Sequence, residues 1–401
     1  MAGEGRIFRR RVFYIPGFDP FHPRRYRELY RKEGAEQARL MGYGLQMQGL
    51  REKNRYAWHV RAEIEGQSAE SEIEVLPWAD IVRQSMSGTI LATYGQLART
   101  AWIYFASGSL WRMAKLRKGP IIAALYPAVF LLLQLGLALG LGGLIGWGIA
   151  RYSHWALGLL AGLTLGYGLL RWFKAKDHKI FAWYLIHDYA FTARLKGEYP
   201  PELEARLAEF AAKIRTALAQ DYDEVLLVGH SSGAHLAVSV LADLLRAGQG
   251  DGRLALLTLG QAVPMAAFLP RAARLRGDLA YLSEMDLFWL DVSAPGDGCS
   301  FALCDPVAVT GVAGAGQKYP LVISAAFRQT LSPQTQKQLK RRWFRLHFQY
   351  LCAFDRLAGR SDDYDYFRIT AGGQSLRARM GGRKPSASRI TRAVNKYTSC
   401  A

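Results

Sequence analysis

The residues Gly-His-Ser-Ser-Gly at positions 229–233 have the G-x-S-x-G pattern of a turn that presents a nucleophilic serine. The apolar residues 225–228 before the motif suit a buried strand, and residues 234–241 after it are typical of a helix. A sharp turn between strand and helix lifts the serine hydroxyl out at the edge of a sheet, and the glycines permit the tight backbone. The pattern and both flanks favour Ser231 as a nucleophile over a chance match in a loop.

A serine hydroxyl is a poor nucleophile and needs a general base beside it. Around a turn of this kind the chain order is serine, acid, histidine, so the base follows Ser231. Of the eight histidines, His235 is too close to the serine to follow a later acid, which leaves His347. We therefore expect His347 to be the base; a structural histidine beside an aromatic core is the alternative.

The acid that orients this histidine is expected just past a strand between the serine and the histidine. Asp297, in the sequence Ser-Ala-Pro-Gly-Asp-Gly at 293–298, closes such a strand and is our choice. Asp291 is the rival if the strand ends earlier, and Asp305 is a weaker one. An Asp beside Gly is also a common turn-former, so a purely structural role is open for each.

A tetrahedral intermediate needs two backbone N–H donors aimed at its oxygen. One donor is expected from Ser232, directly after the nucleophile. The second is expected from a loop after an earlier strand, and Ile-Pro-Gly-Phe-Asp-Pro at 15–20 suits that place. We predict Phe18 as this donor, with Gly17 permitting the turn; a plain strand-ending Pro-Gly turn is the alternative.

Two long stretches of the chain carry no charge, residues 119–150 and residues 152–170. About 20 apolar residues span a bilayer, so two transmembrane helices fit, with a tight turn at 151–154. A buried hairpin of a soluble protein is disfavoured, because a soluble core helix usually keeps a polar face. Glycines spaced four apart allow close packing in lipid, either of the hairpin on itself or on a second copy in a homo-oligomer. These glycines are Gly136, Gly140, Gly142, Gly146, Gly158, Gly162 and Gly166.

Basic residues lie on both outer flanks of these stretches, whereas the turn between them carries only Arg151. The positive-inside rule places such flanks in the cytoplasm. We therefore expect an integral protein of the inner or plasma membrane, with its soluble parts and both termini cytoplasmic and no signal peptide at its basic start. The flanking residues are Arg112, Lys115, Arg117 and Lys118 on one side and Arg171, Lys174, Lys176 and Lys179 on the other.

The formal net charge of +19 favours contact with anionic lipid headgroups, since each nearby Lys or Arg contributes about 1 kcal/mol. A generally basic surface without a specific partner is the alternative. Nucleic acid is disfavoured as a partner, because no recognition motif is present and a membrane hairpin would hold the protein away from it. Residues 373–401 carry seven basic and no acidic residues, which predicts a disordered tail.

The cysteines show neither a disulfide-framework pattern nor histidines at zinc-ligand spacing. We interpret Cys299, Cys304, Cys352 and Cys400 as free thiols, and we expect no metal and no cofactor.

Apolar strand-like stretches alternate with helix-like stretches along much of the chain. This alternation predicts an α/β fold with a mainly parallel sheet covered by helices on both faces. Residues 56–65 and 72–76 alternate with a period of two around a Gly-Gln-Ser turn, which predicts a β-hairpin. The other expected strands are 12–15, 225–228, 254–259, 287–294 and 319–324.

These motifs resemble the α/β-hydrolase superfamily, on its serine esterase and lipase side. The resemblance covers roughly residues 10–85 and 180–370, and the transmembrane hairpin interrupts it. It implies a sheet with the serine turn after a central strand, Ser231 as nucleophile, His347 as general base and acid, and Asp297 as the orienting acid. The chain departs from many members in having Pro-Gly-Phe where they have His-Gly, and a transmembrane hairpin is not a general feature of the family.

We therefore expect four segments: a first part of an α/β-hydrolase domain at 1–110, a transmembrane hairpin with basic flanks at 111–179, the second part of the domain at 180–372, and the tail at 373–401. The expected activity is cleavage of a lipid or other acyl ester at the cytoplasmic membrane face by a Ser-His-Asp acyl-enzyme mechanism. An acyltransferase or thioesterase on the same triad is an alternative. A non-catalytic membrane scaffold is another, since fold alone does not establish activity.

Overall fold

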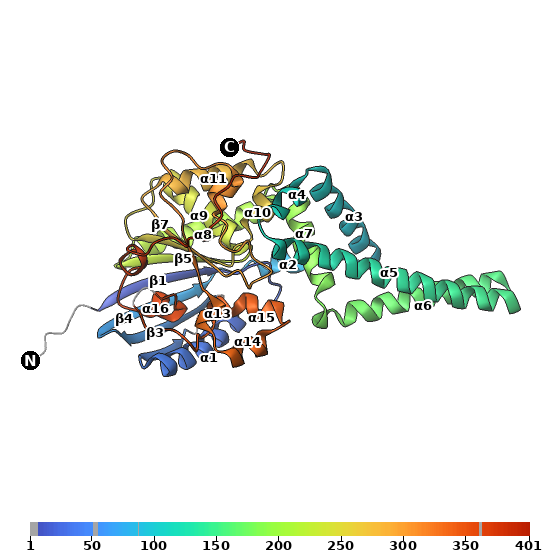
Figure 1. The fold of residues 1–401 in the computed structure, drawn as a ribbon, viewed down its shortest axis with the longest axis horizontal. Coiled ribbons are helices and arrows are strands. Elements are labelled where there is room, and N and C mark those ends of the chain that lie inside the picture. The colour runs from blue at the N-terminus through green and yellow to red at the C-terminus, as the bar shows by residue number, and fades with distance from the viewer. Residues whose placement is uncertain (1–6, 51–54, 87, 361–362) are drawn as a thin grey trace, which may run out of the picture.

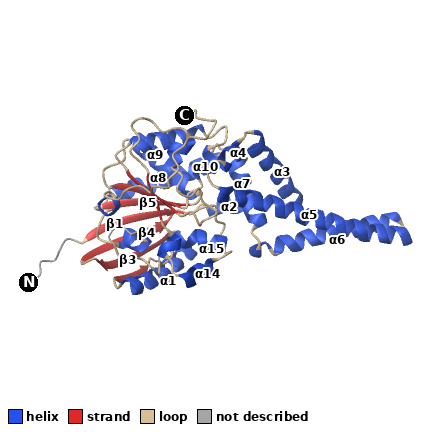
Figure 2. Cartoon of the chain, in the orientation of Figure 1, coloured by secondary structure: helices blue, strands red, loops and turns tan. Residues whose placement is uncertain are grey.

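A single twisted sheet forms the centre of the molecule (Figures 1 and 2). The structure is a computed structural model that describes residues 7–50, 55–86, 88–360 and 363–401, so the first six residues of the predicted segment 1–110 lie outside it. Within this part of the chain the strand order is β2-β3-β4-β1-β5-β6-β7-β8. The strands are β1 Phe8–Ile15, β2 Gly44–Gly49, β3 Tyr56–Ile64, β4 Gln67–Val75, β5 Glu224–His230, β6 Leu254–Leu259, β7 Phe288–Ser293 and β8 Leu321–Ser324.

The sheet is mixed, which corrects the expectation of a mainly parallel sheet. Strands β2, β3 and β4 pair antiparallel, while β4, β1, β5, β6, β7 and β8 run parallel to one another. The antiparallel part follows from short connections: β3 and β4 are joined through Glu65 and Gly66, and so short a link permits only a hairpin. The α/β class and the β3–β4 hairpin were predicted; the added edge strand β2 was not.

Helices cover both faces of the sheet (Figure 1). On β1, Phe13 and Ile15 point into one core, and Val12 and Tyr14 point into the other, as the alternation of a strand requires. The first core lies against α8 (Pro201–Leu218), α9 (Gly233–Arg246) and α11 (Ala273–Glu284). The second lies against α1 (Arg24–Met41), α16 (Tyr366–Ala371) and α17 (Leu376–Met380).

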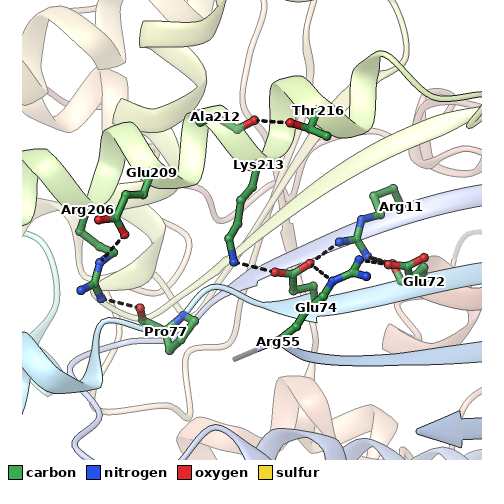
Figure 3. Close-up of polar contacts among 10 residues, drawn as sticks. All are labelled: Arg11, Arg55, Glu72, Glu74, Pro77, Arg206, Glu209, Ala212, Lys213 and Thr216. Atoms are coloured by element: carbon green, nitrogen blue, oxygen red, sulfur yellow. Dashed lines mark hydrogen bonds and ion pairs between the residues drawn. The ribbon is translucent and has the colours of Figure 1, made fainter. Parts of the chain in front are cut away.

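A cluster of charged side chains joins the sheet to α8 (Figure 3). The carboxylate of Glu74 is 3% exposed and accepts hydrogen bonds from Lys213 Nζ at 2.8 Å and Arg55 Nε at 2.9 Å, and it also pairs with Arg11. Burial by itself would raise the pKa of Glu74, but these cations outweigh it and lower the pKa below its ordinary value. A buried charge is tolerated when it is paired in this way.

Two helices form an antiparallel pair that projects from the body (Figure 1): α5 (Lys118–Tyr152) and α6 (Trp155–Ala175). Both are long and apolar enough to cross a membrane, with mean hydropathies of 2.2 and 1.3. At 1.5 Å per residue, the 21 residues of α6 span about 30 Å, the thickness of a bilayer core. The 35 residues of α5 make a longer helix, whose N-terminal part extends into the body.

The glycines at the interface of this pair allow their backbones to touch. A Cβ atom built on Gly142 would lie 2.5 Å from the carbonyl oxygen of Gly162, and one on Gly146 would lie 2.7 Å from that of Gly158. These glycines therefore pack the hairpin on itself. Gly136 and Gly140 have no atom of the described chain within 4 Å of such a Cβ, so they do not take part in this contact.

The N-terminal half of α5 packs against α3 (Ile90–Ala106) and α7 (Ala182–Ala193). The Tyr126 hydroxyl donates to the Ile180 carbonyl at 2.8 Å, and the Trp183 indole donates to the buried Gln134 side chain at 2.9 Å. The hairpin is thus continuous with a helical layer of the body. The remaining helices are α2 Ala79–Met86, α4 Ser109–Ala114, α10 Val263–Ala267, α12 Pro306–Thr310, α13 Phe327–Thr330, α14 Pro333–Leu339 and α15 Trp343–His347, with 3₁₀ turns at Asp177–Lys179 and Phe348–Leu351.

The C-terminal segment 373–401 follows the surface of the body instead of forming the disordered tail that its composition predicted. Arg379 pairs with Glu65, and Arg377 pairs with Asp286 at 2.7 Å. Ile390 forms a parallel bridge with Cys304. Acidic partners elsewhere in the chain neutralise part of its basic charge, and composition alone does not reveal such partners.

Candidate active site

Ser231 lies in the sharp turn between strand β5 and helix α9. Its φ of 58° is in the left-handed region, which residues other than glycine rarely adopt. The backbone N–H of Ser231 donates to Leu259 O at 2.9 Å, which ties the turn to the end of β6. Gly233 begins α9 against the end of β1: a Cβ there would lie 2.3 Å from Ile15 O. Close packing of three chain segments therefore holds this strained serine.

His347 lines the same cavity as Ser231 and is hydrogen-bonded to Asp297. The distance from His347 Nδ1 to Asp297 Oδ2 is 2.7 Å, and both side chains are buried. Asp297 also accepts from the Tyr350 hydroxyl at 3.0 Å and from the Cys299 backbone N–H at 2.9 Å. Burial opposes ionisation of Asp297, but the neighbouring His347 and these donors lower its pKa below the ordinary value. The pair can therefore orient the ring of His347 and stabilise its charged form.

The rival acids lie elsewhere. Asp291 is within strand β7, pairs in register with Thr258 and Val322, and accepts from the Thr258 hydroxyl at 2.6 Å. Asp305 precedes α12 and accepts from the backbone N–H groups of Val307 and Ala308, as a helix-capping residue does. Of the three aspartates, Asp297 is the one that contacts His347.

Ser231 and His347 line one open cavity of about 1520 Å³, called here the main cavity. The Nε2 atom of His347 is buried and has no hydrogen-bond partner among the described residues, and no hydrogen bond joins it to Ser231 Oγ there. Catalytic hydrogen bonds are often long before substrate binds, so the arrangement is compatible with a base that engages the serine in a complex.

His230, the first variable residue of the G-x-S-x-G motif, packs against His347. Its ring stacks on that of His347 with centroids 4.8 Å apart, and its Nε2 is 3.0 Å from the His347 carbonyl oxygen. Its Nδ1 is 3.2 Å from the Tyr14 hydroxyl. Burial, with the charge of His347 as a second cause, lowers the pKa of His230 to about 3, so this ring stays neutral at physiological pH. Sequence reasoning missed this role, because the motif leaves the position unspecified.

The loop after β1 lies directly against the serine. A Cβ built on Gly17 would be 2.9 Å from Ser231 Cβ and 3.4 Å from Ser231 Oγ. The loop is anchored by the Trp78 indole, which donates to Pro16 O at 2.9 Å, and by the Tyr184 hydroxyl, which donates to Phe18 O. This close approach accounts for glycine at position 17.

The predicted oxyanion-hole donors are available. Among the hydrogen bonds of the described residues, none is donated by the backbone N–H of Phe18 or of Ser232. Ser232 stands at the N-terminus of α9, where the helix dipole favours negative charge. Phe18 follows β1 and Ser232 lies at the start of α9, so the two predicted donors belong to the two segments that meet at Ser231.

Asp188 on α7 is one of the carboxyl groups that line the main cavity, and sequence reasoning missed it. Burial raises its pKa to about 7, while His347 and the nearby hydroxyl of Ser232 act in the opposite direction. Asp188 therefore changes charge near neutral pH beside the serine and histidine. No sequence motif marks it, since it is brought there by the packing of α7.

Three side chains could offer ligands to a metal ion: Asp297, Cys299 and His347 have ligand atoms within 4.8 Å of one another. Burial raises the pKa of the Cys299 thiol well above its ordinary value, which disfavours the thiolate that binds metals. His347 Nδ1 is already bonded to Asp297. The cluster is thus better suited to a hydrogen-bonded pair than to a metal centre. All four cysteines are free thiols.

Comparison with protein-family models gives no match to this chain. Comparisons with curated proteins and with solved structures give no match either. The function of this chain is therefore inferred from the geometry of the site.

Proposed function

We propose that this chain is a membrane-anchored serine hydrolase of the α/β-hydrolase type, which cleaves a lipid or other acyl ester at the cytoplasmic membrane face. The observation that carries the proposal is the strained Ser231, placed between β5 and α9, in one cavity with His347, whose Nδ1 is bonded to the buried Asp297. Ser231 follows the carboxyl end of β5, Asp297 follows that of β7, and the predicted oxyanion loop follows that of β1, where open α/β sheets bind their ligands.

In the proposed reaction, Ser231 Oγ attacks the ester carbonyl carbon while His347 Nε2 takes the hydroxyl proton. Asp297 keeps the Nδ1–H of His347 oriented, and the N–H groups of Phe18 and Ser232 stabilise the oxyanion. Collapse of the intermediate breaks the ester bond, and His347 donates its proton to the leaving alcohol. Water then attacks the acyl-serine with His347 as base, which releases the acid and restores the serine.

The membrane location in this proposal is supported by α5 and α6, which are long and apolar enough to cross a bilayer. The basic flanks of the pair favour a cytoplasmic body and contact with anionic headgroups. Both features bring the main cavity close to ester substrates that reside in lipid.

The direct test is labelling of the membrane-bound protein with a serine-reactive fluorophosphonate. We expect labelling of the intact protein and its loss in Ser231→Ala, whereas Ser239→Ala, a buried serine on α9 outside the cavity, keeps it. No labelling of well-folded protein would instead favour the scaffold alternative. Transfer of the acyl group from an ester substrate to an added alcohol or thiol, rather than to water, would favour the acyltransferase.

The substrate is tested with two esters. We expect a long-chain ester in anionic vesicles to be cleaved faster than a short soluble ester. Raising the salt to 1 M should reduce the difference between the two hydrolysis rates, because it shortens the Debye length from about 10 Å to about 3 Å. Equal or better turnover of the short ester, without dependence on vesicle charge, would contradict a lipid substrate and leave the serine hydrolase intact.

A further inference from the structure

A second, apolar cavity of about 560 Å³ lies between α3, α4 and the body end of α5, and is called here the side cavity. None of the described residues that line it is charged. Its walls include Leu97 and Ala101 of α3, Leu110 of α4, Ala124 and Ala128 of α5, and Ile186 of α7. The volume is within the range of about 300–1,000 Å³ that is typical of small-molecule pockets.

The side cavity adjoins the main cavity. Tyr189, Ala262, Met265 and Cys299 line both. Ala262 is close to the nucleophile, since its backbone N–H is 3.4 Å from the Ser231 carbonyl oxygen. These four residues therefore form the boundary between the space beside the serine and the side cavity.

The two cavities differ in chemistry. The main cavity is lined by many charged groups, among them Asp19, Arg25, Lys32, Glu33 and Arg345. The Tyr104 hydroxyl, one of the few polar groups of the side cavity, is already bonded to Met265 O at 3.0 Å. The main cavity therefore offers charged partners to a polar part of a ligand, whereas the side cavity suits a hydrocarbon.

The outer wall of the side cavity carries exposed apolar side chains. Trp102 is 70% exposed, Phe105 56% and Leu125 45%. Trp102 and Phe105 belong to α3 and Leu125 belongs to α5, the helix that continues outward from the body into the projecting pair (Figure 1). Exposed aromatic residues of this kind are typical of surfaces that contact lipid.

We propose that the side cavity binds the hydrocarbon chain of a long acyl ester, with the carbonyl at Ser231 and the polar alcohol part in the main cavity. The inference rests on the proposed function and names its substrate class: an ester with a long acyl chain and a polar alcohol. The acyl chain of the ester enters sideways from the bilayer, past the exposed residues of α3 and α5.

Bulky substitutions inside the cavity test this assignment. Ala124→Trp adds a bulky side chain that fills part of the side cavity from α5. Ala98→Trp narrows the cavity from α3, at an exposed position where a large side chain does not disturb the packing of the body. The matched controls are Ile122→Trp on α5 and Ala92→Trp on α3, which are exposed and do not line the cavity. Each protein is assayed in one detergent with p-nitrophenyl butyrate and p-nitrophenyl palmitate, which differ in the acyl chain alone.

We expect both cavity variants to lower the palmitate-to-butyrate ratio of kcat/KM by tenfold or more, with butyrate hydrolysis within about twofold of the parent. The controls keep the parent ratio. An unchanged ratio in both cavity variants, or an equal fall in the controls, would overturn the assignment while leaving the serine hydrolase in place.

A second measurement does not depend on activity. A photoreactive palmitate analogue is crosslinked to membrane-bound Ser231→Ala protein, and labelling of residues 97–128 is compared with that of α6 in the same molecule. We expect this ratio to fall severalfold when Ala124→Trp is added, and to stay constant with Ile122→Trp. A constant ratio in both would refute the acyl site even if no ester proves to be a substrate.

Discussion

At the scale of single residues, the site combines a strained serine with a histidine that is held from two sides. Asp297 bonds one edge of the His347 ring, and the neutral His230 ring supports its face and carbonyl. A neutral neighbour matters, because a second imidazolium would oppose the positive charge that His347 gains as it takes the serine proton. Nucleophile, base and orienting acid are expected to act as one unit.

The choice of acid is tested by comparing Asp297→Asn with Asp291→Asn. We expect Asp297→Asn to lower kcat/KM by about 10²–10⁴-fold, because an amide does not hold the required tautomer of His347. Ser231→Ala and His347→Ala are expected to cost at least about a thousandfold each, without adding in the double variant. Asp291→Asn should leave kcat/KM within a few fold. A damaging Asp291→Asn beside a silent Asp297→Asn would refute the assignment.

Asp188 is expected to shape the alkaline side of the pH profile. Its pKa of about 7 means that it ionises as the pH rises through neutrality, beside the N-terminus of α9. The new negative charge repels the developing oxyanion, so the rate of hydrolysis should fall above pH 7. Asp188→Asn should remove that fall in rate, whereas Asp188→Glu should retain it. A profile that is identical in the parent and in Asp188→Asn would contradict this role.

The same shift has a consequence for stability. Because the folded-state pKa of Asp188 is raised from its ordinary value of 3.8 to about 7, its neutral form favours the folded state; this contribution is fully present below pH 3.8 and is lost progressively as the pH rises to about 7. Asp188→Asn should therefore increase the free energy of unfolding relative to the parent above pH 7, as measured by denaturant titration.

At the scale of elements, the site depends on how closely the loop after β1 approaches the turn after β5. Gly17 and Gly233 are the two positions where a side chain would separate these segments. The loop in turn is fixed by Trp78, which follows β4, and by Tyr184 of α7. Elements far apart in sequence thus set the position of one predicted oxyanion donor.

Gly17→Ala tests this approach. The added methyl group would lie 2.9 Å from Ser231 Cβ, so the loop must shift and carry the Phe18 N–H away from the oxyanion. Loss of one such donor costs about 10²–10³-fold in kcat, so we expect a fall of that order with a smaller change in KM. Gly252→Ala, where no atom lies within 4 Å, is the control. Parent-like kcat for Gly17→Ala would show that this loop does not supply the donor.

At the scale of the whole molecule, the helical pair and the sheet form one continuous body. A Cβ on Gly119 of α5 would lie 3.0 Å from Gly298 Cα, next to Asp297. The start of the candidate membrane span therefore touches the loop that carries the predicted acid. In the proposed membrane arrangement, this contact sets how the site faces the bilayer.

The membrane arrangement is tested by extraction and by labelling. We expect the intact protein to resist alkaline carbonate and to require detergent, and a variant in which residues 139–165 are replaced by a short Gly-Ser linker to be released. A cysteine at position 153 should be labelled from the side opposite to a reporter fused after Ala401. Release of the intact protein by carbonate, or labelling of both positions from one side, would refute the hairpin topology.

The sequence by itself determined the features that are local in the chain: the strand, turn and helix around Ser231, the β3–β4 hairpin, and two uncharged stretches of membrane length. These follow from neighbouring residues and their periodicity. Tertiary structure decided what depends on contacts between distant segments. It brought Asp297 rather than Asp291 or Asp305 to His347, added β2 to make the sheet mixed, and placed Asp188 in the cavity. It also paired the glycines of α5 with those of α6 and laid the basic C-terminal segment along acidic partners. The physical reason is that long-range pairing depends on shape and charge complementarity between segments, which a local pattern does not contain.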